Sequence, residues 1–208
     1  MPSYNSQMLS IRRLARRFAW LAAIALASAA SCPTGTGTAT IAQPTLYNLY
    51  PSQPAVAEAP VSFLQIQRYQ NQSVFEQAAV FSGIPAGATS CTLGWRQAAP
   101  AERHFIVVGS ALIAALQLQG FPPASGSPSG PVVSYASVEP FEKATNATAL
   151  HPDFTAWDKV AEAQGHIAGT VACAEEIYLK LSLDGRNGDG HLYFNQDEKN
   201  GFYVTFTC

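Results

Sequence analysis

The sequence lacks close cysteine pairs, long hydrophobic runs and dense charge, and each lack excludes a class of protein. Its four cysteines include no Cys-x-x-Cys pair, the spacing that zinc sites and redox motifs commonly use. The apolar run over residues 18–29 is about a dozen residues long, against the roughly twenty that cross a bilayer. Only 12% of the residues are charged, which is more typical of secreted β-proteins than of cytosolic enzymes. These lacks argue against a zinc protein, a redox enzyme and a membrane anchor.

Catalytic and metal-binding motifs are also missing. The sequence holds no Gly-x-Ser-x-Gly elbow, no His-Glu-x-x-His helix and no phosphate-binding glycine loop. Residues 184–190 resemble a calcium loop, but Arg186 and Gly188 stand where oxygen ligands belong, so a hairpin turn is the simpler interpretation. We therefore predict no catalytic residue, no metal site, no cofactor and no enzymatic activity.

Residues 1–30 have the organisation of a secretory signal peptide. Four arginines at positions 12–17 precede the apolar run, and small residues with the spacing of a cleavage site end it at positions 27–30. A signal anchor is the alternative. Because these arginines are the only charges in the segment, 8 of the 12 basic residues and all 14 acidic ones remain after cleavage, a formal charge of −6. A chain of this sign offers no positive surface for nucleic acid or for an anionic membrane.

The rest of the chain has the hydrophobic pattern of an all-β protein. Residues 31–44 are small, polar and uncharged, and are predicted to form a flexible leader before a domain over residues 45–208. Apolar and polar residues alternate, as in half-buried strands, along residues 89–96, 176–183, 191–195 and 202–208. The last three segments follow one another across Gly- and Asn-rich turns, which predicts an antiparallel meander. We therefore expect an antiparallel β-sandwich with a C-terminal three-strand meander.

Two segments leave room for one short helix. Residues 110–119 are rich in Ala and Leu and stop at Gly120, but the β-branched residues before them favour a strand that continues through Gly109. Residues 155–158 resemble a capping box, which leaves a short helix and a loop both open. We predict a strand for the first segment.

Three tyrosines share the polar face of the predicted meander: Tyr178, Tyr193 and Tyr203. If the strands pair in register, these side chains form an exposed aromatic strip of the kind that stacks on sugar rings. Isolated exposed tyrosines are the simpler interpretation, because tyrosine is common on strands.

Two sequons predict N-linked glycans in a eukaryotic host. They are Asn71-Gln72-Ser73 and Asn146-Ala147-Thr148, and both lie in polar stretches that are expected to be exposed. We therefore predict glycosylation at Asn71 and Asn146.

The spacing of the cysteines indicates structural disulfides formed in an oxidising compartment. Cys91 and Cys208 each share a strand face with apolar residues, so both thiols point into the core and we predict a Cys91–Cys208 bond. In a meander, Cys173 lies at the opposite end from Cys208, farther away than the roughly 7 Å that bridged Cα atoms allow. Cys173 is left to pair with Cys32, if cleavage spares it, or to stay buried and free.

Three blocks of the sequence resemble the fungal But-two family, which is named for the C-terminal domain of a ubiquitin-3-binding protein. They are residues 50–52, 84–93 and 201–208, and the proline-glycine-cysteine block at 84–93 is the most specific. The resemblance covers residues 45–208 and departs from the family in the Pro-rich stretch 121–131. It implies a secreted or wall-associated fungal protein with a β-rich domain and no established enzyme activity. The family name also implies a ubiquitin-like modifier as partner, although such modifiers are cytosolic or nuclear and this chain carries an export signal.

Together these patterns predict a secreted fungal protein of the cell wall or the extracellular space, with a non-enzymatic binding or structural role. Its expected partner is a cell-wall polysaccharide or an extracellular protein. Two alternatives stay open: a small β-sandwich hydrolase that acts on polysaccharide, and a secreted effector that acts on a host target.

Overall fold

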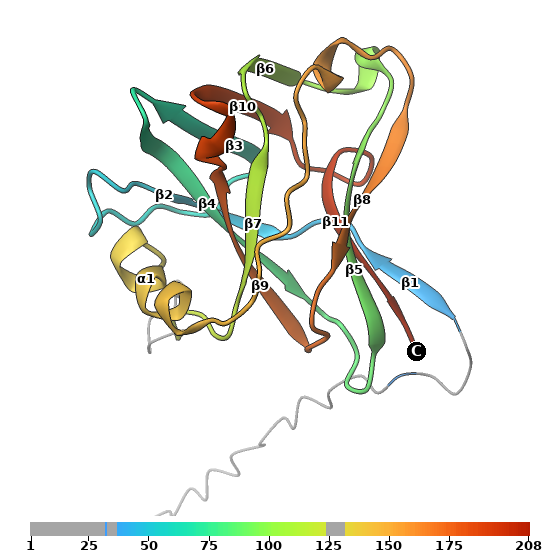
Figure 1. Ribbon diagram of the computed structural model, residues 1–208. Helices are drawn as coiled ribbons and strands as arrows, with labels where there is room; N and C mark the ends of the chain where they lie inside the picture. Colours follow the sequence, from blue (N-terminus) through green and yellow to red (C-terminus); the bar gives the residue numbers. More distant parts are fainter. Residues whose placement is uncertain (1–31, 33–36, 124–131) are drawn as a thin grey trace, which may run out of the picture.

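Two antiparallel β-sheets pack against each other in this protein (Figure 1). The computed structural model describes residues 32, 37–123 and 132–208, so the signal peptide predicted over residues 1–30 lies outside the described residues. The arrangement confirms the predicted all-β sandwich. Within the described ranges, no helix combines the length and the apolar character needed to span a membrane.

The smaller sheet has the strand order β1-β11-β5-β8, and the larger one has the order β6-β10-β3-β4-β9-β7 with β2 also paired to β4. The strands of the smaller sheet are β1 (Thr38–Ile41), β5 (Thr89–Gln97), β8 (Gln164–Thr170) and β11 (Gly201–Thr207). Those of the larger sheet are β2 (Thr45–Leu49), β3 (Phe63–Tyr69), β4 (Gln72–Ser82), β6 (Phe105–Gly109), β7 (Ile113–Leu118), β9 (Glu176–Leu183) and β10 (Gly190–Asn195). All the pairings between these strands are antiparallel.

The core lies between the sheets, on the strand faces that the alternation predicted. The apolar residues of β9 and β11 that were predicted to point inward are all buried, as are those of β5. At the centre, the rings of Trp95 and Phe154 lie 4.2 Å apart, and Phe154 also contacts Phe194 and Phe202 edge-on. Residues of the opposite parity therefore point away from the core, and they form the outer faces of the sandwich.

The predicted C-terminal meander is wrong, because β9, β10 and β11 do not pair with one another. β9 lies between β4 and β7, β10 between β3 and β6, and β11 between β1 and β5. Residues 184–190 are not a hairpin but a connection between non-adjacent strands, with a short 3-10 turn at Gly185–Asn187. Alternating apolar residues determine which face of a strand is buried, but they do not determine which strand lies beside it.

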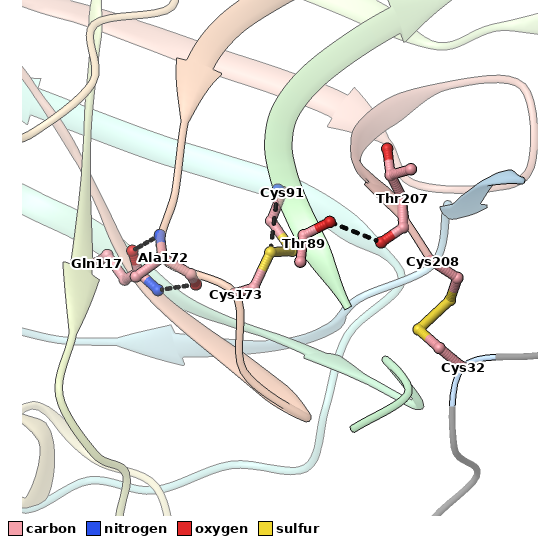
Figure 2. The surroundings of a disulfide bond; sticks show 8 residues. All are labelled: Cys32, Thr89, Cys91, Gln117, Ala172, Cys173, Thr207 and Cys208. Carbon is pink, nitrogen blue, oxygen red and sulfur yellow. Dashed lines mark hydrogen bonds between the residues drawn. A yellow bond between two sulfur atoms is a disulfide. The ribbon is translucent and has the colours of Figure 1, made fainter. Parts of the chain in front are cut away.

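The predicted Cys91–Cys208 bond is also wrong. The structure joins Cys91 to Cys173 and Cys32 to Cys208, with Cα atoms 5.3 Å and 5.2 Å apart (Figure 2). Cys173 follows β8, and β8 pairs with β5, so Cys173 lies beside Cys91. Cys208 follows β11, where its N–H donates to the carbonyl of Gly37 just before β1. The prediction failed because it placed Cys173 by a meander that does not exist.

The loop between β8 and β9 is fixed to both sheets. The disulfide at Cys173 joins it to β5 of the smaller sheet, and the side chain of Gln117 joins it to β7 of the larger one (Figure 2). The Nε2 of Gln117 donates to the carbonyl of Ala172, and the N–H of Ala172 donates to Oε1 of Gln117, each at 2.8 Å. These bonds hold the two sheets together at this end of the sandwich.

Several shorter segments also differ from the prediction. The leader predicted over residues 31–44 is wrong in part, because Thr38–Ile41 pairs with β11 as an edge strand. The strand predicted over residues 110–119 is confirmed as β7, but it is separate from β6. Residues 155–158 give no α-helix; a 3-10 turn forms at Trp157–Lys159, and another at Pro100–Glu102.

The α-helix of the described residues, α1 (Tyr135–Ala144), was not predicted. Ser134 and Ser137 form a capping box, in which each hydroxyl accepts from the other residue's N–H at 3.2 Å and 2.8 Å. The helix contains Pro140, a residue that argues against a helix interior and so hides the element in the sequence. It packs on the outer face of the larger sheet, where its Glu142 carboxylate lies 2.6 Å from the ammonium of Lys180 on β9.

Candidate functional site

The outer face of the smaller sheet carries the candidate site. On β11 the alternation buries Phe202 and turns Tyr203 outward, and on β5 it buries Trp95 and turns Gly94 and Arg96 outward. A hollow of about 710 Å³ lies over this face and is lined by Arg96 and Tyr203, among others. Its size falls within the range of small-molecule sites in proteins.

The side chain of Tyr203 crosses the sheet directly over Gly94, where any larger residue would collide with it. A Cβ atom on Gly94 would lie 2.4 Å from Cζ and 2.5 Å from the hydroxyl oxygen of Tyr203. A Cβ atom on Gly165 would lie 3.8 Å from the same oxygen, and the hydroxyl itself donates to the carbonyl of His166 at 3.5 Å. The side chain thus reaches from β11 over β5 to β8, and it lines the hollow.

The guanidinium of Arg96 lies over this aromatic platform. Its guanidinium carbon lies 5.4 Å from the centre of the Tyr203 ring, within the range of a cation–π contact. The same guanidinium donates to the backbone carbonyl of Glu198, in the loop between β10 and β11. Both contacts hold the arginine over the ring, where it lines the hollow.

The loop between β10 and β11 forms one wall of the hollow and is fixed by side-chain hydrogen bonds. The Asp197 carboxylate accepts the N–H groups of Lys199 and Asn200 at 2.8 Å and 3.0 Å. Asn200 is buried, and its Oδ1 accepts the N–H of Ala98 at 2.9 Å, which ties the loop to the segment after β5. The wall residues Glu198 and Lys199 therefore project from a well-supported turn.

The charges around the hollow are balanced. Arg96 and Lys199 supply positive charge, and Glu102 and Glu198 supply negative charge. Lys199 forms an ion pair with Glu102, and this hydrogen bond and charge raise the pKa of the lysine. With two side chains of each sign, the hollow attracts neither strong anions nor strong cations.

The platform rests on a packed aromatic layer. Below it, the rings of Trp95 and His166 stack 4.0 Å apart, and Trp157 meets the same imidazole edge-on at 4.1 Å. Burial lowers the pKa of His166, and its Nε2 has no hydrogen-bond partner among the described residues, so the imidazole is neutral near pH 7. A tightly packed layer of this kind keeps the sheet beneath Tyr203 rigid.

The three tyrosines of the possible aromatic strip do not come together. Because their strands are not neighbours, Tyr178 stacks instead on Phe121 at 5.0 Å, and Tyr193 on Phe63 at 5.3 Å. Burial and the Glu176 carboxylate raise the pKa of Tyr178 to about 12. Of the three, Tyr203 lines the hollow.

Both predicted glycosylation sites are exposed and lie away from the hollow. Asn71 is the second residue of the two-residue turn between β3 and β4, with φ of 61°, and its N–H donates to Asp189. Asn146 lies in the loop after α1. Glycans on these residues would leave the outer face of the smaller sheet open.

The sequence predicted no catalytic, cofactor or metal residue, and it did not point to Gly94 or Arg96. The available signal was a glycine inside an alternating strand, which often marks a close approach by another group. Within the described part of the chain, no group of three or more His, Cys, Asp or Glu is placed to hold a metal ion. No family model matches the chain, and no curated protein matches it either. The resemblance to the But-two family therefore stays a prediction.

Proposed function

We propose that this is a secreted, non-enzymatic domain that binds a neutral polysaccharide of the fungal cell wall or extracellular matrix at the Tyr203 hollow. The observation that carries the proposal is the Tyr203 ring, which lies against Gly94 and lines the hollow. The C–H groups on one side of a pyranose ring are slightly positive, and they stack on the negative face of an aromatic ring. Thr40, Gln164 and Thr205 line the same hollow and offer hydroxyl and amide groups to the sugar hydroxyls.

Charge and cysteine chemistry support the same proposal. The balanced charges of the hollow suit an uncharged ligand better than nucleic acid or an acidic polymer. Two disulfides are compatible with an oxidising compartment, where the predicted signal peptide would deliver the chain. The fungal source and the wall location come from the resemblance to the But-two family.

Binding to polysaccharides, both as insoluble material and as soluble chains, tests the proposal. The purified domain should bind at least one of chitin, β-glucan and mannan, and Tyr203→Ala should weaken that binding roughly tenfold or more. Tyr69→Ala is the matched control, because Tyr69 is 60% exposed on β3 of the larger sheet. Failure of the wild-type domain to bind any of the three polymers would refute the proposal, as would equal losses in the two variants.

Two carboxylates in the hollow give the hydrolase alternative a specific form. Glu102 and Glu198 both line the hollow, and paired carboxylates are the usual groups for glycoside hydrolysis. The ion pair with Lys199 already occupies Glu102, which favours binding over catalysis. Release of reducing ends from the bound polymer separates the two functions. If it occurs, and if Glu102→Gln and Glu198→Gln each abolish it, the domain is an enzyme.

We also propose that Asn71 and Asn146 carry N-linked glycans in the secreted protein, since both side chains are exposed. Endoglycosidase treatment should lower the mass of protein secreted by a eukaryotic host, and the Asn71→Gln/Asn146→Gln variant should show no change. An unchanged mass for the wild-type protein would exclude both sites.

A further inference from the structure

Four threonines form a row across the whole outer face of the smaller sheet. Strand register places Thr40 opposite Thr205, Thr205 opposite Thr92, and Thr92 opposite Thr170. Thr40 and Thr170 are exposed, and the other two are half-buried. None of the four hydroxyls makes a hydrogen bond to any described residue, so all four are free to bind a ligand. We call this row the threonine ladder.

The ladder begins inside the hollow and leads out of it. Thr40 and Thr205 line the hollow, whereas Thr92 and Thr170 continue the row over β5 and β8. The neighbouring row consists of Tyr203, Gly94 and Ile167, and the Ile167 side chain is 78% exposed. A line of hydroxyls thus runs beside an apolar strip. Neither row contains a charged residue, and the guanidinium of Arg96 lies over the Tyr203 ring at the hollow end of the strip.

We infer that the ligand is a single linear polysaccharide chain that lies across the strands, from the hollow along the threonine ladder. This inference rests on the proposed function and specifies its ligand. Adjacent strands lie about 4.8 Å apart, so the four threonines span roughly 14 Å, which is enough for several consecutive sugar units. Each strand adds one free hydroxyl to the row, and the apolar strip faces the C–H groups of the sugar rings.

The twist of the sheet limits the form of the polymer. Neighbouring strands rotate by roughly 20–25° relative to one another, so the ladder turns by about 60–75° from its first strand to its last. A single chain can follow that turn by rotation about its glycosidic bonds, but the flat face of a crystalline polymer cannot. The domain should therefore prefer single soluble chains to crystalline surfaces.

A size series of oligosaccharides tests the inference. The probes are β-glucan oligosaccharides and chito-oligosaccharides, from the disaccharide to the hexasaccharide, measured by calorimetry. Wild-type affinity should rise with chain length. Thr92→Val/Thr170→Val should leave disaccharide binding unchanged and weaken hexasaccharide binding roughly tenfold, because each lost hydrogen bond contributes modestly. Thr45→Val is the matched control, since Thr45 is an exposed threonine on β2 of the larger sheet.

The outcomes separate the ladder from the proposed function. Binding along the threonine ladder is refuted if wild-type affinity does not change with oligosaccharide length. It is also refuted if the double variant keeps the full length dependence. Tyr203-dependent disaccharide binding would in that case leave the proposed function intact. If no oligosaccharide binds, both fail. Valine is β-branched like threonine, so the variants should fold, and their melting temperatures check this. If the double variant unfolds, Thr170→Val alone, on the edge strand β8, should still reduce hexasaccharide binding.

Discussion

Gly94→Ala should disturb both the stability of the sheet and the position of Tyr203. The new Cβ would lie 2.4 Å from Cζ of Tyr203 and 2.7 Å from the carbonyl oxygen of His166. The tyrosine can rotate away, but the carbonyl belongs to the backbone of β8 and cannot move without straining the strand pairing. Overpacking of this kind lowers the free energy of unfolding by about 1–3 kcal/mol. The displaced ring should also cost the domain most of its polysaccharide binding.

Gly165→Ala is the matched control for this substitution. Its Cβ would lie 3.8 Å from the Tyr203 hydroxyl, an ordinary contact, so stability and binding should stay close to wild type. Urea denaturation gives the free energy of unfolding of both variants, and retention on polysaccharide gives their binding. If Gly94→Ala matches wild type in both measurements, the Tyr203 ring does not lie against Gly94 and its assignment as the binding platform is wrong.

Three further predictions concern the rest of the molecule. Cys91→Ala/Cys173→Ala should lower the free energy of unfolding by about 4–5 kcal/mol in the chain-entropy description, because the disulfide links residues 82 positions apart in the chain. Peptide mapping without reductant should give the Cys91–Cys173 linked peptide, and its absence would contradict the pairing. Burial lowers the pKa of His166 below its ordinary 6.5. The neutral imidazole therefore contributes fully to stability above pH 6.5, and this contribution is lost as the pH falls from 6.5 through the lower pKa of the folded state. The free energy of unfolding of His166→Phe should fall less than that of wild type between about pH 7.5 and about pH 5, and equal falls would show that this imidazole is not responsible. Lys180→Met should lower the free energy of unfolding by about 3–5 kcal/mol, because it leaves the Glu76 carboxylate buried without a cation. In the wild-type protein this carboxylate is 7% exposed and lies 2.9 Å from the Lys180 ammonium. The double variant Lys180→Met/Glu76→Leu should recover most of that loss in urea denaturation, and an unaffected single variant would refute the reasoning.

Strand faces were predictable from the sequence, and strand partners were not. The alternation along β9 and β11 correctly placed their apolar residues in the core, because burial of one face leaves a local period of two. Pairing depends on contacts between distant segments, and the sequence does not carry it locally. The incorrect meander then produced the incorrect disulfide, since Cys173 was placed by chain order instead of by its position after β8.

The candidate site was only partly visible in the sequence. The polar parity of Tyr203 predicted correctly that this side chain leaves the core, but its position over Gly94 follows from the pairing of β11 with β5. The threonine ladder needs the register of all four strands of the smaller sheet, one of which falls in a segment predicted to be a flexible leader. Edge strands such as β1 are ordered mainly by backbone hydrogen bonds, so side-chain patterns identify them poorly.

Mapping of backbone amide chemical shifts during titration with a β-glucan or chitin hexasaccharide tests the central claim most directly. The account predicts shift changes at outward positions of β1, β5, β8 and β11, including Thr40, Gly94, Gly165 and Thr205. Residues of the larger sheet, such as Tyr69 on β3, should be unaffected. Changes centred on the larger sheet, or none at saturating ligand, would contradict the assignment of the Tyr203 face as the binding site.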